Sequence, residues 1–250
     1  MRFSHSIFAT MLKNRTRTGF RTGLLACVVC PCLLSANVIF AQSTTATTAP
    51  APSTQGTVRP PSRFEQDPIA PQKGDTSSAI RVALRTIHGV IEFDLYRRAA
   101  PATVENFIRY VDGGYWTGGI FHRTVKLDNQ PDKDDKVKIQ VIQGAIGDLY
   151  RQYALPPIEL ETTAQTGLKH LDGTISMARD EPNTAQYEFF ICIGDQPSLD
   201  FGGKRNPDGQ GFAAFGRVVK GMDVVKKIHQ SKAAGQTLTP PILIMGIRRK

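Results

Sequence analysis

The chain has 250 residues and a formal net charge of +9, with 31 Lys and Arg against 22 Asp and Glu. Five of the cations lie in the first 21 residues, which contain no acid, so the rest of the chain carries only +4. Because no run of Lys and Arg stands out, this charge gives little support for nucleic-acid binding. The length allows one or two domains.

Residues 1–41 have the order of a secretory signal peptide: a basic segment, an apolar run and small residues before Ala41. We expect cleavage near Ala41 and a periplasmic or secreted mature chain without stable membrane insertion. A retained membrane anchor is the alternative, because the apolar run approaches the roughly 18 residues of a spanning helix, although Pro31 interrupts it. A lipoprotein modified at Cys27 is a third interpretation, but the residues after Cys27 are strongly apolar.

Three of the four cysteines, Cys27, Cys30 and Cys32, lie in this segment, so a metal site built from them would be lost on cleavage. The mature chain would keep only Cys192, which excludes an intramolecular disulfide. Its fold must therefore be stabilised by a hydrophobic core.

Residues 42–78 are dominated by Ser, Thr, Pro and Ala and contain few large apolar groups. Such a segment cannot bury enough surface to offset its ordering entropy, so we predict a disordered linker. From residue 79 the composition becomes that of a globular domain, which predicts a single folded domain over 79–250.

This domain begins with a predicted β-hairpin. Apolar residues alternate over 79–86 and again over 90–95, and a His-Gly turn signal separates the two runs. A helix is predicted from Pro101, because apolar residues follow at helical spacing until Gly113 and Gly114.

The remainder of the domain consists of short predicted strands and one further helix, over 221–229. The strands are separated by loops rich in Gly, Pro and Asp, and they cover 120–125, 137–144, 173–179, 188–194, 211–219 and 241–249. Many short strands with two helices at separate places indicate a mainly β fold, a closed or nearly closed barrel capped by helices.

Most common catalytic and metal-binding motifs are absent. There is no G-x-S-x-G, phosphate loop or G-x-G-x-x-G after a strand, and the five histidines do not pair at metal spacing. Residues 128–136 are rich in carboxylates, but their spacing does not follow an EF-hand loop, so we interpret them as solvated. We expect neither a metal nor a cofactor.

Three predicted strands place a polar residue beside apolar ones on one face. Arg123 would share a face with Phe121 and Val125, and a guanidinium is costly to bury unpaired, so its partner is a structural carboxylate or a ligand. Such faces are typical of a shallow apolar pocket with a few oriented donors and acceptors. The other two sets are Val141 with Gln143, and Glu188 with Phe190 and Cys192.

Five longer segments stand in a fixed order: "APATVENF", "GYWTGGIFHR", "IQG", "GTISMARDEPNTAQYEFFICIG" and "AAFGRVVKGMDVV". Together they resemble the successive signature segments of the cyclophilin family of peptidyl-prolyl cis/trans isomerases. The resemblance runs from about residue 80 to the end of the chain. It implies a closed eight-stranded antiparallel β-barrel capped by two α-helices, with proline-containing polypeptides as substrates and no cofactor.

The resemblance also implies that Arg123 is the catalytic residue. An X-Pro bond rotates slowly because its partial double-bond character gives a barrier of roughly 18–20 kcal/mol. A guanidinium that donates a hydrogen bond to the prolyl nitrogen would localise the nitrogen lone pair and stabilise the twisted state.

Nine further residues match the family's substrate-binding positions. Phe190 matches the floor of the proline pocket, and Gln143 a glutamine that helps to hold the substrate backbone. Ala178 matches a position whose backbone binds the peptide, and Met177 packs behind it. The remaining matched positions are Phe121, Val141, Glu188, Leu199 and Phe212.

Several features depart from the family pattern. Glu188 replaces a glutamine, Phe212 replaces a histidine of eukaryotic members, and the charged loop over 124–139 is longer. By analogy Glu188 points towards Arg123, so we expect its carboxylate to pair directly with the guanidinium, which it either orients or holds away from substrate. The alternative to an active isomerase is therefore a proline-peptide-binding or chaperone module with little turnover. We expect a monomer.

Overall fold

The computed structural model of the chain describes residues 73–131 and 137–250. The predicted signal peptide, most of the predicted linker and the centre of the charged loop lie outside these residues. Contacts with the domain begin a few residues before 79, because the amide of Gly74 donates to the carbonyl of Thr166 (2.7 Å).

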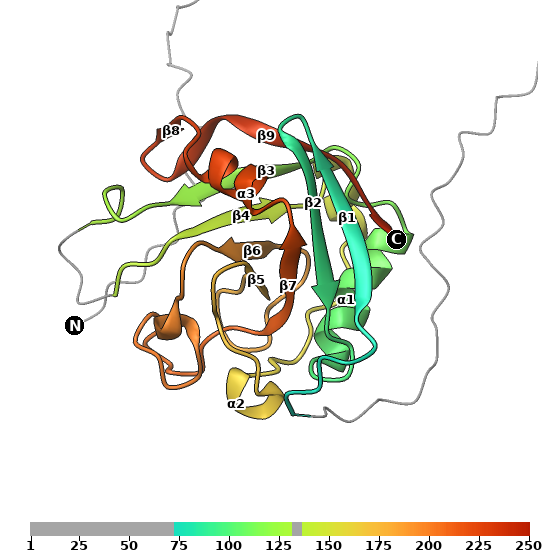
Figure 1. The fold of residues 1–250 in the computed structure, drawn as a ribbon, viewed down its shortest axis with the longest axis vertical. Coiled ribbons are helices and arrows are strands. Elements are labelled where there is room, and N and C mark those ends of the chain that lie inside the picture. The colour runs from blue at the N-terminus through green and yellow to red at the C-terminus, as the bar shows by residue number, and fades with distance from the viewer. Residues whose placement is uncertain (1–72, 132–136) are drawn as a thin grey trace, which may run out of the picture. The chain divides into compact units, whose positions relative to one another are not determined.

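Eight antiparallel strands form a closed barrel, which confirms the predicted fold (Figure 1). They follow the order β1-β2-β7-β5-β6-β4-β3-β9, and pairing between β1 and β9 closes the ring. The strands are β1 Ile80–Thr86, β2 Gly89–Leu95, β3 Gly119–Val125, β4 Val141–Ala145, β5 Thr174–Met177, β6 Phe189–Cys192, β7 Ala214–Lys220 and β9 Thr237–Arg249. A two-residue strand, β8 (Ala233–Ala234), forms a hairpin with the start of β9 and is additional to the prediction.

Both predicted helices are present. They are α1 (Pro101–Asp112) and α3 (Met222–His229), which are separated by β2 and β7 in the view of Figure 1. A one-turn helix, α2 (Thr163–Thr166), and two 3-10 turns, Asp148–Tyr153 and Pro197–Leu199, are additional to the predicted elements.

The start of α1 is stabilised by a residue far along the chain. Pro101 suits the first helical turn, but Ala100 before it has no side chain that can cap the free amides. Glu161 supplies the cap: its carboxylate accepts from the amides of Ala102 (3.1 Å) and Thr103 (2.8 Å). Its negative charge also suits the positive end of the helix dipole.

Aromatic rings fill the interior of the barrel. Phe107 of α1 lies at their centre, with ring centroids 5.2 to 6.1 Å from those of Phe93, Trp116, Phe189 and Phe215. These rings are at most 1% exposed. The apolar spacing of the predicted helix therefore describes the face by which α1 packs on the barrel.

Strand β6 separates two apolar clusters. Phe189 and Ile191 belong to the main core, whereas Phe190 and Cys192, which point the opposite way, belong to a second cluster on the outer face. This outer cluster consists of Val125, Ile139, Val141, Phe190, Cys192 and Leu199, with Ala178 and Phe212 packed against it.

The alternation of faces breaks at His122 in β3. The pairing register shifts between Phe121 and Arg123 against both neighbouring strands, β4 and β9. An extra residue in a strand reverses the faces beyond it, so Phe121 belongs to the main core while Val125 belongs to the outer cluster. The prediction that Phe121 shares a face with Val125 is therefore wrong, because a simple alternating pattern cannot show a bulge.

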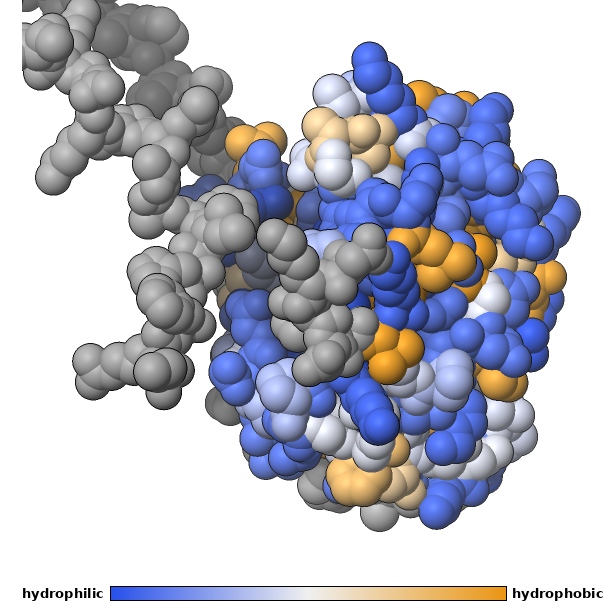
Figure 2. Space-filling view, turned by 90° about the vertical axis from the view of Figure 1, so that its left-hand side faces the viewer, coloured by the Kyte–Doolittle hydropathy of each residue, from blue (hydrophilic) through white to orange (hydrophobic). Residues whose placement is uncertain are grey.

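The face of the domain seen in Figure 2 is mostly polar. On the face seen in Figure 2, hydrophobic residues form small separate patches in a largely hydrophilic surface. No helix within the two described ranges is long and apolar enough to cross a membrane.

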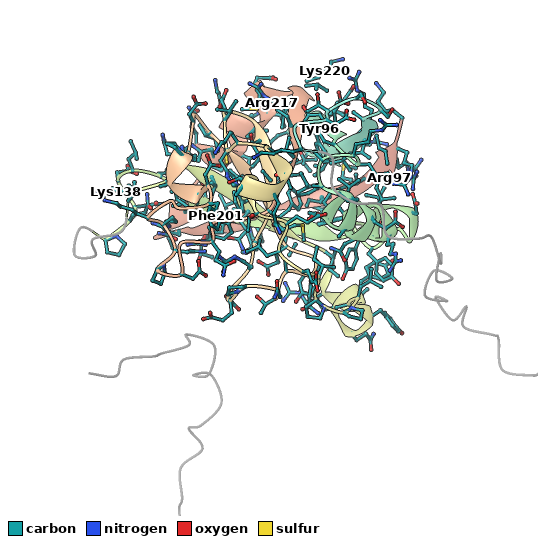
Figure 3. All side chains as sticks on the ribbon, turned by 90° about the horizontal axis from the view of Figure 1, so that it is seen from below. Tyr96, Arg97, Lys138, Phe201, Arg217 and Lys220 are labelled. Carbon is teal, nitrogen blue, oxygen red and sulfur yellow. The ribbon has the colours of Figure 1, made fainter. Side chains whose placement is uncertain are left out.

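The loop between β3 and β4 and the loop between the 3-10 turn Pro197–Leu199 and β7 lie on the same side of the domain, where Figure 3 labels Lys138 of the first and Phe201 of the second. Arg205 joins them, since its guanidinium donates to the side chain of Gln130 (3.2 Å) and to the carbonyl of Val137 (3.0 Å). These loops border the strands β4 and β6, whose outer faces carry the candidate site.

Candidate active site

The strand register places a row of side chains across the outer face of the barrel. Arg123 of β3 pairs with Gln143 of β4, Gln143 pairs with Phe190 of β6, and Phe190 pairs with Ser176 of β5. Residues paired directly across antiparallel strands point to the same face. Three residues predicted to act together, Arg123, Gln143 and Phe190, are therefore neighbours.

Arg123 is held by two glutamine side chains. Its Nε and Nη2 both donate to Oε1 of Gln236 (2.9 and 2.6 Å), and its Nη1 donates to Oε1 of Gln143 (3.0 Å). Burial lowers the pKa of Arg123, as does the nearby charge of Arg205, while Glu188 opposes the shift. A guanidinium keeps its charge in proteins, so Arg123 is a fixed and partly desolvated cation.

Gln236 is a site residue that sequence reasoning missed. It lies between β8 and β9, 113 residues from Arg123, and no motif marks it. It reaches the site because Thr237, its neighbour in β9, pairs with Arg123 across the sheet. Only the pairing of β3 with β9 identifies this residue.

The predicted direct pair between Glu188 and Arg123 is absent from the described part of the chain, so that prediction is wrong. The Glu188 carboxylate accepts instead from Nε2 of Gln143 (2.5 Å), whose Oε1 faces Arg123. Glu188 therefore acts on the arginine through Gln143 and fixes the direction of that amide. His122 lies 3.8 Å from the same carboxylate, and burial lowers the pKa of His122 although the Glu188 charge opposes this.

Five of the predicted substrate-binding residues meet in the outer cluster. Phe190 and Phe212 pack edge to face, with ring centroids 5.3 Å apart at 88°, and the Arg179 guanidinium lies 5.3 Å from the centre of the Phe212 ring. The cluster is therefore an ordered apolar group beside Arg123, and its partly exposed members are Ala178 and Phe212. The five residues are Val141, Phe190 and Leu199, which are buried, and Ala178 and Phe212, which are partly exposed.

Phe121 and Met177 lie in the main core, where they are 0% and 1% exposed. Phe121 packs against Phe189 with ring centroids 5.7 Å apart, so it supports β3 from inside the barrel and does not face the outer cluster. Met177, predicted to pack behind Ala178, is likewise a buried member of the main core and does not belong to the outer cluster. The amide of Ala178 already donates to the carbonyl of Glu188 (2.9 Å), so a peptide would have to bind through the carbonyl of Ala178.

Phe190 is backed by a buried hydrogen-bonded set. The His170 ring stacks on it, with centroids 6.0 Å apart at 16°. His170 Nδ1 lies 2.8 Å from Oδ1 of Asp200, and Nε2 lies 3.0 Å from Oγ of Ser176. Because His170 and Ser176 are at most 1% exposed, this Asp-His-Ser set cannot reach a substrate as a nucleophilic triad would. It fixes the position of the Phe190 ring.

We expect His170 to make the domain less stable below about pH 6.5. Burial lowers the pKa of His170, although the Asp200 carboxylate opposes this, so the unfolded chain binds a proton that the folded domain does not. The contribution of neutral His170 to stability is complete above the pKa that His170 has in the unfolded chain. It is lost as the pH falls from that value through the lower pKa of His170 in the folded domain.

The variant His170→Gln tests this expectation by urea unfolding between pH 6.5 and 5. The free energy of unfolding of the wild type should fall with pH more steeply than that of the variant, by up to about 1.4 kcal/mol per pH unit. Equal slopes would show that His170 does not resist protonation in the folded domain.

No group of three or more His, Cys, Asp or Glu side chains within residues 73–131 and 137–250 could hold a metal ion. The polar groups of the site are instead a cation, two amides and one carboxylate, set beside an apolar surface. Such a site can bind an apolar ring and polarise a neutral group attached to it.

The protein is a closed β-barrel with a candidate binding site on its outer face. Comparisons with known proteins show the family to which it belongs. The sequence profile described as "Cyclophilin type peptidyl-prolyl cis-trans isomerase/CLD" matches residues 80–249. The chain belongs to this family and is a peptidyl-prolyl cis-trans isomerase, an enzyme whose substrates are proline-containing peptides.

Relatives from bacteria show moderate identity. The chain is 38% identical over 157 residues to peptidyl-prolyl cis-trans isomerase A of Dickeya dadantii, which covers 62% of this chain and 73% of the relative. It is 36% identical over 148 residues to peptidyl-prolyl cis-trans isomerase B of Escherichia coli, which covers 59% and 82%. A crystal structure of a cyclophilin type peptidyl-prolyl cis-trans isomerase from Cryptosporidium parvum has a TM-score of 0.53 at 22% identity, covers 69% and 98%, and supports the fold alone.

Proposed function

We propose that this isomerase accelerates X-Pro rotation by a hydrogen bond from Arg123 to the prolyl nitrogen while the proline ring lies on the outer cluster. The observation that carries the proposal is the row in which Arg123 is separated from Phe190 by Gln143 alone. No covalent bond is broken in the reaction, so positioning and electrostatic stabilisation are sufficient for catalysis.

The donors of Arg123 support this role. A guanidinium has five N–H groups, and the bonds to Gln236 and Gln143 use three of them. Within the described residues, one N–H on each terminal nitrogen is left for a substrate. In the planar peptide the nitrogen lone pair is delocalised, whereas in the twisted state it is localised and accepts a hydrogen bond more strongly. Arg123 would therefore stabilise the transition state more than either ground state.

All residues of this row come from one chain, so the proposed mechanism requires no second subunit. The apolar surface around Phe190 would bind the proline ring and displace water from it. Removal of water also strengthens the hydrogen bond that Arg123 donates. The mechanism requires neither a metal nor a cofactor.

Glu188 should influence the reaction chiefly through the Gln143 amide, since its hydrogen bond goes to that amide and not to Arg123. We expect Glu188→Gln to change kcat/KM by less than about threefold, because a glutamine carbonyl still accepts from Nε2 of Gln143. Glu188→Ala should lower it by about five- to tenfold, because one hydrogen bond of the order of 1 kcal/mol no longer fixes that amide. Both are measured on one X-Pro peptide. A marked rise in Glu188→Gln would show instead that the carboxylate restrains Arg123.

The proposed function is tested by a protease-coupled isomerisation assay on several X-Pro peptides, comparing the full chain with Arg123→Ala. Acceleration that disappears in a folded variant supports the role of Arg123. Peptide binding without acceleration by the wild type would favour the alternative, a binding or chaperone module. The bond that already engages the Gln143 amide with Glu188 is the observation in favour of that alternative.

We also propose that the enzyme acts on exported proteins, in the periplasm or after secretion. The support is the order of basic, apolar and small residues over 1–41. N-terminal sequencing of the chain made in a Gram-negative host should find a first residue near Gln42 in the extracytoplasmic fraction. An uncleaved chain in the membrane fraction would support the retained anchor, and a lipid on Cys27 would support the lipoprotein.

A further inference from the structure

We propose that Gln236 is a positioning residue for Arg123: its side-chain carbonyl sets the plane of the guanidinium, so that the one N–H still free on each terminal nitrogen is directed to the prolyl nitrogen. This inference deepens the proposed function and rests on it. Oε1 of Gln236 accepts from both Nε and Nη2 (2.9 and 2.6 Å). Two bonds from one edge of a planar group fix its rotation about the last side-chain bonds, which a single bond does not.

The Gln236 amide has a defined direction. Its Nε2 donates to the main-chain carbonyl of Asn129 (3.4 Å), so Oε1 must be the atom that faces Arg123. The backbone of Gln236 is fixed as well, because its carbonyl accepts from the amide of Thr124, the residue that follows Arg123 (2.9 Å). Gln236 and Arg123 are therefore held on one framework.

Asn129 connects this framework to the long loop after β3. Its Nδ2 donates both to the carbonyl of Thr124 and to that of Gly235, each at 3.0 Å. The side chain thus joins β3 to the turn between β8 and β9. The position of Gln236 depends on these two hydrogen bonds of Asn129, which explains how a residue outside any motif comes to lie against the site.

A neutral acceptor suits the proposed chemistry. Within the described residues no carboxylate lies within ion-pair distance of Arg123, and its acceptors are the amides of Gln143 and Gln236. An amide orients the guanidinium without neutralising it, so the charge stays available to the substrate. A carboxylate at 236 would keep the geometry and add a charge-assisted pair.

Three variants of the full chain separate positioning from a structural role. Gln236→Met keeps the length of the side chain and removes the acceptor, and we expect kcat to fall by about tenfold with KM nearly unchanged. Gln236→Glu keeps the acceptor but pairs a charge with the guanidinium, so it should retain more of kcat than Gln236→Met. Lys232→Ala, an exposed change in the same hairpin, is the matched control and should alter neither constant.

NMR detects the hydrogen bond between Arg123 and Gln236 through the rate at which the Arg123 Nε–H exchanges with solvent. This proton should be protected in the wild type and in Gln236→Glu, and should exchange at least about tenfold faster in Gln236→Met. In an Arg123→Lys background, Gln236→Met should cost less than about twofold in kcat, because the coupled partner is already gone.

These measurements distinguish a failure of the proposed function from a failure of the positioning role of Gln236. A wild type that does not accelerate X-Pro rotation, yet protects the Arg123 Nε–H, would refute the proposed function and leave the contact established. An active wild type with an equally active Gln236→Met would overturn the positioning role. Equal losses in Gln236→Met and Gln236→Glu would overturn it as well, because the acceptor would then not be what matters.

Discussion

Replacing Arg123 with alanine should lower kcat/KM for X-Pro peptides by about 100-fold or more, the cost of removing a donor aimed at the transition state. The variant loses both N–H groups that remain after the bonds to Gln143 and Gln236. Because Arg123 lies on the outer face and not in the main core, the fold should survive. A protease-coupled assay measures the activity, and circular dichroism with thermal unfolding checks the fold.

Arg123→Lys separates charge from geometry. An ammonium group keeps the positive charge but cannot reproduce the planar fork that donates to Gln236 and Gln143, so we expect a loss of about tenfold or more. If the folded alanine variant kept kcat/KM within about threefold of the wild type, rotation would not depend on this residue, contrary to the magnitude expected for such a donor.

Phe189→Ala should reduce the free energy of unfolding by roughly 3–5 kcal/mol, the usual cost of truncating a buried phenylalanine. The ring is fully buried, and its centroid lies 5.1 to 5.7 Å from those of Phe107, Trp116 and Phe121. Its removal leaves a cavity beside Phe107 of α1 and Phe121 of β3. Urea unfolding at 25 °C measures the loss, which is a large share of the stability of an ordinary domain.

The adjacent residue provides the matched control. Phe190 lies on the same strand but faces the outer cluster, so Phe190→Ala should chiefly impair the binding of proline peptides and should destabilise the domain less than Phe189→Ala. Phe189→Ala should therefore be the more damaging variant in the stability assay, and Phe190→Ala should have the lower kcat/KM relative to its loss of stability. If Phe189→Ala cost less than about 1 kcal/mol, the packing of the aromatic core would differ from that described here.

Much of the fold could be predicted from local patterns. Helical spacing after Pro101 identified the buried face of α1, and alternation identified the two faces of β6 correctly, because both depend on residues near in sequence. Alternation failed in β3, where the register shift around His122 places Phe121 in the core. A bulge is decided by pairing with β4 and β9, so no pattern within β3 reveals it.

The candidate site was predictable in part. Arg123, Gln143 and Phe190 follow from the family resemblance, and the strand register makes them neighbours. Glu188 was expected to pair with Arg123, which is wrong, because its carboxylate accepts a hydrogen bond from Gln143 instead. The direction in which a flexible carboxylate points depends on all the groups around it, and these come from different strands.

The sequence by itself determined the mainly β domain, the two longer helices and the family, because periodicity and extended motifs are local properties of the chain. The tertiary structure alone decided which distant groups meet. The cap on α1 comes from Glu161, because Ala100 offers no local one, and Gln236 reaches Arg123 across 113 residues. Both contacts satisfy polar groups that would otherwise lose their partners on burial, and only the closed barrel brings the partners within hydrogen-bonding distance.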